Sequence, residues 1–205
     1  MTVLDIRTPH GLACAHLQAA QDPRAALVLG HGAGGGIAAP DLVATRDAAL
    51  LEGSSVALVE QPYRIAGRRT PAPAAHLDAA WTAVVERLRT NELGELPLIV
   101  GGRSLGGRVA CRTAEATGAV AVLCLAFPLT PPQRAGRPPQ SRLPELEAVT
   151  LPMLVVQGER DPFGIPPPGP SREVVVVPGD HGLKADTMAV AAAVRAWLSG
   201  VVVLA

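Results

Sequence analysis

Between residues 98 and 116 the chain reads LIVGGRSLGGRVACRTAEA. The run Leu98–Val100 is short, apolar and partly β-branched, which is typical of a buried strand. The Ala-rich run 108–116 favours a helix. Between them lies a G-x-S-x-G pattern centred on Ser104, in which a serine occupies the tip of a strained turn from strand to helix. A side chain at either outer position of this pattern would clash across the turn, so glycine suits Gly102 and Gly106.

Glycine-rich loops also match G-x-S-x-G by chance, and this chain contains 21 glycines. The flanking strand and helix are therefore what make the pattern informative. The remainder of the chain must supply the other groups that a nucleophilic serine needs.

Composition restricts the classes of protein considered. A length of 205 residues, with 48% hydrophobic and 18% charged residues, favours a single globular domain spanning residues 1–205. The formal net charge is zero and aromatic residues make up only 2%, which argues against a nucleic-acid partner. The cysteines, Cys14, Cys111 and Cys124, lack metal-site spacing and are expected to be buried thiols of a reducing compartment.

No secretory signal or membrane span is expected. Charged or polar residues near the N-terminus interrupt any apolar leader, and Arg195 and Gly200 interrupt the apolar C-terminal stretch. These features favour a cytoplasmic protein without a membrane partner.

Apolar and amphipathic runs alternate along the chain. Predicted strands are 3–7, 12–17, 26–29, 55–59, 98–100, 119–125, 153–156 and 173–177, and predicted helices are 41–51, 74–93, 108–116 and 184–198. This alternation predicts an α/β fold, a doubly wound, mostly parallel sheet of about 7–8 strands with helices on both faces and an antiparallel opening hairpin. Two Pro-rich segments, 128–144 and 166–170, are expected to be loops over the site, and they leave no room for a lid domain.

An acid and a histidine follow Ser104 in the order that nucleophile-elbow enzymes use. Asp161 comes after the strand 153–156 and His181 after the strand 173–177, and both lie in turns. Asp161 is preferred over Glu159, which lies nearer the strand end. His181 is the only histidine after the elbow, so it is the predicted base, oriented by Asp161. We interpret Asp180 as a cap.

Acyl transfer also needs hydrogen-bond donors for the oxyanion. The backbone N–H of Leu105 is one candidate, because it follows the nucleophile at a helix N-terminus. The Gly-rich loop 31–36 is the second source, with Ala33 as the predicted donor. That loop lacks the patterns of phosphate-binding loops, and His31 is interpreted as a structural residue of the turn.

Taken together, these motifs resemble the α/β-hydrolase superfamily, and within it the small, lidless branch often called dienelactone hydrolase-like, which includes testis-expressed and chromatin-complex-associated hydrolase-like proteins of animals. The stretches that carry the resemblance are 31–34, 62–64, 101–108, 127–129, 156–158, 161–164 and 180–181. The resemblance implies a Ser-Asp-His triad without cofactor or metal. Dienelactone hydrolases proper use a cysteine nucleophile, so their substrate is not implied for Ser104.

Several side chains near the predicted site are candidates for substrate binding. Tyr63, Arg64 and Arg103 are the main ones, and Arg68, Arg69 and Arg108 lie nearby. Arginines of this kind either bind a substrate carboxylate or form ion pairs within loops, and we favour ion pairs.

The sequence therefore predicts a serine hydrolase that cleaves a small-molecule carboxylic ester or thioester through an acyl-enzyme. Two alternatives stay open. One is a binding module that keeps the fold without turnover, and the other is an acyltransferase or perhydrolase that uses the same triad.

Overall fold

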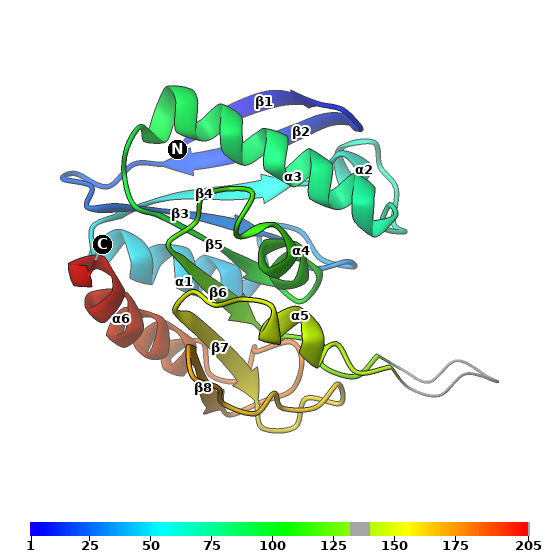
Figure 1. Ribbon diagram of the computed structural model, residues 1–205, viewed down its shortest axis with the longest axis vertical. Coiled ribbons are helices and arrows are strands. Elements are labelled where there is room, and N and C mark those ends of the chain that lie inside the picture. Colours follow the sequence, from blue (N-terminus) through cyan, green and yellow to red (C-terminus); the bar gives the residue numbers. More distant parts are fainter. Residues whose placement is uncertain (132–139, 205) are drawn as a thin grey trace.

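The computed structural model describes residues 1–131 and 140–204, and in this part of the chain an eight-stranded sheet forms the centre (Figure 1). The strands are β1 (Thr2–Thr8), β2 (Gly11–Gln18), β3 (Ala25–Gly30), β4 (Ser54–Glu60), β5 (Leu98–Arg103), β6 (Ala121–Leu125), β7 (Met153–Gly158) and β8 (Arg172–Val177). Their order across the sheet is β1-β2-β4-β3-β5-β6-β7-β8. The β1–β2 hairpin is antiparallel, β2 is antiparallel to β4, and the other neighbours are parallel. The predicted fold class is confirmed.

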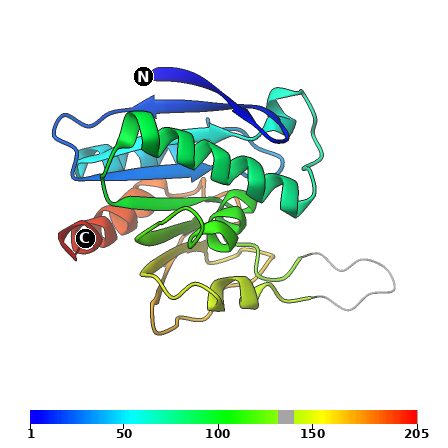
Figure 2. The same ribbon diagram turned by 45° about the horizontal axis from the view of Figure 1, so that its top comes forward.

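Helices cover both faces of this sheet (Figures 1 and 2). They are α1 (Pro40–Leu51), α2 (Pro62–Ile65), α3 (Ala74–Leu88), α4 (Leu105–Thr113), α5 (Leu143–Glu147) and α6 (Thr187–Leu204). Trp81 of α3 and Val109 of α4 belong to the core on one face, whereas Leu42 of α1 and Val194 of α6 belong to the core on the other. No helix in residues 1–131 and 140–204 is both long and apolar enough to cross a membrane.

Several helix boundaries differ from those predicted. The helix predicted over 74–93 ends as an α-helix at Leu88 and continues as a π-helical turn over Arg89–Leu93. The last helix begins at Thr187 instead of residue 184, because Leu183 has a left-handed φ of 47° and Asp186 accepts a hydrogen bond from the Ala189 N–H at 2.9 Å. The helix after the elbow begins earlier, at Leu105. The short helices α2 and α5 were not predicted.

The carboxyl ends of the parallel strands meet at one edge of the sheet, and the predicted site residues follow them. In open α/β sheets this edge is where ligands bind. The Pro-rich segment 128–144 leaves β6 at the same edge, but its central part, 132–139, lies outside the described residues.

Candidate active site

Three loops bring the predicted triad together. Ser104 follows β5, Asp161 follows β7 and His181 follows β8. The Ser104 hydroxyl lies 3.0 Å from His181 Nε2, and His181 Nδ1 lies 2.8 Å from Asp161 Oδ2. Because a carboxylate only accepts hydrogen bonds, Nδ1 carries the proton and Nε2 is free to accept the one on Ser104. This is the arrangement in which a histidine activates a serine.

The elbow is packed tightly against β3. Ser104 itself has a left-handed φ of 51°, as a strained nucleophile turn requires. A Cβ on Gly106 would lie 2.2 Å from the carbonyl oxygen of Gly30, and one on Gly102 would lie 2.4 Å from the same atom. The glycines are thus needed chiefly because β3 approaches the turn, and less because the turn closes on itself.

Gln157 is a supporting residue that the sequence reasoning missed. Its Nε2 donates to Asp161 Oδ2 at 2.8 Å, and its Oε1 accepts from the Phe127 backbone N–H at 2.9 Å. The other carboxylate oxygen, Oδ1, accepts from the Phe163 N–H at 2.9 Å. These bonds fix the Asp161 carboxylate toward His181. A polar residue within the otherwise apolar strand β7 was the available signal.

Arg103 holds the histidine loop in place. Its Nη2 donates to the His181 carbonyl oxygen at 2.9 Å, and its Nε lies 2.9 Å from Asp41 Oδ2, whose side chain is fully buried. Burial raises the pKa of Asp41, although the neighbouring guanidinium opposes that rise. Arg103 does line the cavity beside Ser104, yet its charge is compensated by an internal ion pair, as the preferred sequence interpretation stated.

The two predicted oxyanion donors, the N–H groups of Leu105 and Ala33, belong to residues that line the same cavity as Ser104. His31 orients the second of them. Its Nε2 accepts from the Gln61 N–H at 3.2 Å, so its Nδ1 carries the proton and donates to the Gly32 carbonyl at 2.8 Å. Since C=O and N–H point in opposite directions across a trans peptide, fixing that carbonyl also fixes the Ala33 N–H.

His31 is 2% exposed, and burial lowers the pKa of its imidazole, which favours the neutral ring that this pattern of bonds requires. The histidine is therefore a structural element of the turn, in agreement with the sequence interpretation.

Tyr63 and Arg64 do not reach the cavity. Tyr63 is 3% exposed, and its hydroxyl donates to the Ala33 carbonyl at 3.1 Å, so it stabilises the loop 31–36. Arg64, in the short helix α2, is not among the cavity-lining residues. The structure therefore does not bring Tyr63 or Arg64 to the cavity beside Ser104. That cavity has a volume of about 570 Å³.

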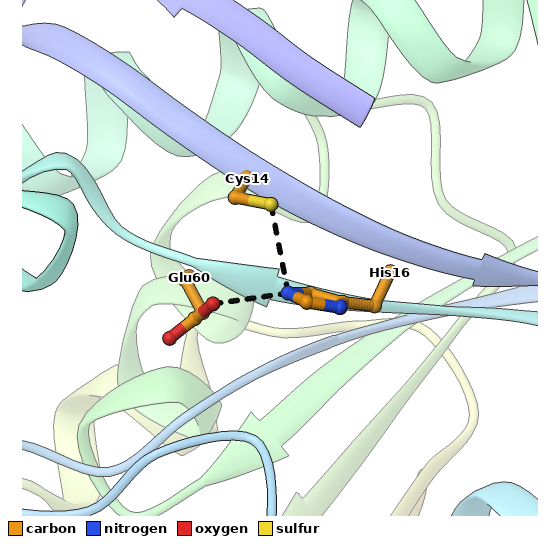
Figure 3. A group of neighbouring side chains, drawn as sticks. All are labelled: Cys14, His16 and Glu60. Carbon is orange, nitrogen blue, oxygen red and sulfur yellow. Dashed lines mark hydrogen bonds and ion pairs between the residues drawn. The ribbon is translucent and has the colours of Figure 1, made fainter. Parts of the chain in front are cut away.

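One cluster of metal-type ligands lies elsewhere, on β2 and β4 (Figure 3). His16 Nε2 lies 3.0 Å from Glu60 Oε2 and 3.5 Å from Cys14 Sγ. A metal on Nε2 would place the proton on Nδ1, a buried atom that has no hydrogen-bond partner among the described residues. Metal-bound histidines normally donate that proton to an acceptor. An Nε2–H donated to Glu60 accounts for the contacts without a metal.

A family model for the alpha/beta hydrolase domain matches residues 23–188, and the chain belongs to this family. No curated protein matches the sequence significantly.

Solved structures share the fold at low sequence identity. The lidless α/β serine hydrolase XC6422 from Xanthomonas campestris has a TM-score of 0.77 and 16% identity, with coverage of 96% of this chain and 92% of that one. Est1E from Butyrivibrio proteoclasticus has a TM-score of 0.78 and 15% identity, covering 99% and 100%. Dienelactone hydrolase from Anabaena variabilis has a TM-score of 0.75 and 17% identity, covering 96% and 95%. At these identities the similarity shows the α/β-hydrolase fold.

Proposed function

We propose that the protein is a serine hydrolase that cleaves a carboxylic ester or thioester through an acyl-enzyme. The observation that carries the proposal is the continuous chain of contacts from Asp161 through His181 to Ser104, at 2.8 and 3.0 Å. The family match supports the hydrolase class, and structural neighbours that include an esterase domain and a dienelactone hydrolase make ester bonds the first choice.

In the proposed reaction, Ser104 Oγ attacks the substrate carbonyl carbon while its proton passes to His181 Nε2. Asp161 keeps the ring in the required tautomer and stabilises the imidazolium that forms. The N–H groups of Leu105 and Ala33 bind the oxyanion, and the partial positive charge at the start of α4 adds to that stabilisation.

Collapse of the tetrahedral intermediate breaks the bond to the alcohol or thiol, and that leaving group takes the proton from His181. A water molecule then attacks the acyl carbon and gives one proton to His181 Nε2. His181 returns that proton to Ser104 Oγ as the acid leaves, so the scheme balances without a cofactor or metal.

The test is labelling with a fluorophosphonate, which reacts rapidly only with an activated serine. We expect the wild type to label, and Ser104→Ala and His181→Ala to stay unlabelled. Ser104→Ala is expected to lower kcat on an ester by about 10⁴-fold or more. A folded wild-type protein that does not label would instead support a binding module, and faster transfer to an added alcohol than to water would support an acyltransferase.

A further inference from the structure

The cavity beside Ser104 is lined by arginines. In the part of the chain that the structure describes, Arg103, Arg108, Arg112 and Arg142 are among the lining residues and no aspartate or glutamate is. Arginines that are largely removed from water are usually paired with carboxylates. The four arginines of the cavity differ in whether they have such a partner.

Two of them form bidentate ion pairs with carboxylates that do not line this cavity. Arg108 binds Glu145 in the bidentate manner, with N–O distances of 2.8 and 2.5 Å, and Arg112 binds Asp78 in the same manner at 2.8 and 2.6 Å. The third nitrogen of Arg112, Nη1, is buried and lies 3.6 Å from Glu145 Oε2, within ion-pair distance. Both guanidinium groups are therefore compensated by carboxylates.

Arg142 has no such pair. Its guanidinium donates from Nη1 to the Pro128 carbonyl oxygen at 3.1 Å, and within residues 1–131 and 140–204 it forms no salt bridge. The eight residues 132–139 contain no acid either.

The two half-buried arginines differ in electrostatic environment. Burial opposes the charge on Arg112, but Asp78 and Glu145 outweigh it and raise its pKa. Burial, with Arg108 beside it, lowers the pKa of Arg142, and the charge of Glu145 only partly opposes this. A guanidinium stays charged at neutral pH regardless. Arg142 is therefore a cation, partly removed from water, that would be stabilised by an anion.

We propose that Arg142 forms an anion subsite of the cavity, and that the substrates are esters bearing a carboxylate at a distance from the bond that Ser104 attacks. This inference rests on the proposed function and adds the substrate class to it. The planar guanidinium fork matches a carboxylate, and a cavity of about 570 Å³ has the size of a small-molecule site.

The first test compares two 4-nitrophenyl esters of equal chain length, the neutral hexanoate and the anionic monoester of adipic acid. A second pair carries the anion in the alcohol part: 4-acetoxyphenylacetate and its neutral N-methyl amide. For at least one pair, the ratio of kcat/KM for anionic over neutral substrate is expected to exceed about tenfold, since a charged hydrogen bond contributes about 1.5–3 kcal/mol. No preference in either pair would overturn the subsite.

Variants of Arg142 test whether this side chain causes the preference for anionic esters. Arg142→Gln keeps a donor for Pro128 but removes the charge, and it should lower the ratio about 10- to 100-fold, chiefly through KM of the anionic ester. Arg142→Lys keeps the charge and should retain part of the ratio. Arg160→Gln is the matched control, because Arg160 is exposed and paired with Glu159, and it should leave the ratio unchanged. An Arg142→Gln ratio equal to the wild-type ratio would refute the assignment.

Binding without turnover separates this inference from the proposed function. The adipate monoester is titrated calorimetrically into Ser104→Ala and into the Ser104→Ala, Arg142→Gln double variant. If the wild type neither labels with fluorophosphonate nor hydrolyses any ester, the proposed function fails, whereas binding lost only in the double variant still supports the subsite. Labelling and neutral-ester hydrolysis without anionic preference or binding would overturn the subsite alone.

Discussion

Replacing His31 tests whether that side chain orients the loop 31–36, which contains the proposed oxyanion donor Ala33. The imidazole bridges two backbone groups, the Gly32 carbonyl at 2.8 Å and the Gln61 N–H at 3.2 Å. His31→Phe preserves the ring and its edge-on contact with Tyr63 but removes both hydrogen bonds. His31→Asn places an amide nitrogen where Nδ1 lies, so it keeps the bond to Gly32 and loses only the bond to Gln61.

The two variants are expected to lose different amounts of unfolding free energy and of kcat. His31→Asn leaves the Gln61 N–H without its partner, which should cost about 1–3 kcal/mol of unfolding free energy. His31→Phe does the same and also leaves the Gly32 carbonyl with only a long bond, from the Gly35 N–H at 3.4 Å, so it should lose more. Removal of a whole oxyanion donor costs about 10²–10³ in kcat. Because Tyr63 still holds the Ala33 carbonyl, the donor is misaligned and not lost, and His31→Phe should lower kcat by about 10- to 100-fold.

The assay is kcat on 4-nitrophenyl acetate, divided by the concentration of protein that a fluorophosphonate titrates, with urea unfolding of the same preparations. His31→Asn is expected to stay within a few-fold of the wild type in kcat. If His31→Phe is destabilised as expected but turns over as fast as His31→Asn, the imidazole stabilises the fold without orienting Ala33, and the argument from peptide geometry is refuted.

Three further outcomes are expected. Gly106→Ala would place a Cβ 2.2 Å from a β3 carbonyl oxygen, whereas nothing lies within 4 Å of a Cβ on Gly35. Urea unfolding should therefore show a loss of about 3 kcal/mol or more for Gly106→Ala and a change of under about 1 kcal/mol for Gly35→Ala. Equal values would contradict the packing of the elbow. Gln157→Leu removes the donor to Asp161 and should lower kcat about 10- to 100-fold, with an unchanged value counting against a positioning role. Burial lowers the pKa of His31, so below about pH 6.5 the unfolded chain binds a proton that the folded protein does not. The unfolding free energy should therefore fall as pH drops, by at most about 1.4 kcal/mol per pH unit from this group. A slope equally steep in His31→Asn would show that other groups cause it.

The sheet and the meeting of Ser104, Asp161 and His181 were predictable from the sequence, because each depends on local pattern. Continuous apolar strands define a parallel sheet, and the carboxyl ends of such strands place the residues that follow them at one edge. Ser104, Asp161 and His181 all follow strands, so their meeting needed no knowledge of side-chain packing. The helix ends were less predictable, since a left-handed residue such as Leu183 leaves no clear signal in the sequence.

The substrate-binding side chains could not be predicted in the same way. Whether an arginine is compensated depends on partners distant in the chain: Arg108 finds Glu145, 37 residues away, and Arg112 finds Asp78, 34 residues away. Glu145 lies in α5, a helix of five residues that begins next to Pro144 and lacks a periodic signal. Sequence distance from Ser104 therefore suggested Arg103, which is paired internally, and gave no reason to consider Arg142.

Strand order also relates the elbow to the loop that contains Ala33. Gly30, at the end of β3, contacts the turn that carries Ser104 because β3 and β5 are neighbours in the sheet. The loop that continues from Gly30 contains Ala33. Ser104 and the proposed oxyanion donor at Ala33 are therefore held relative to each other by a contact of three glycines, in which Gly102 and Gly106 face Gly30. A change that widens this contact should thus impair the oxyanion site before it disrupts the Asp161–His181 pair, which is anchored separately on β7 and β8.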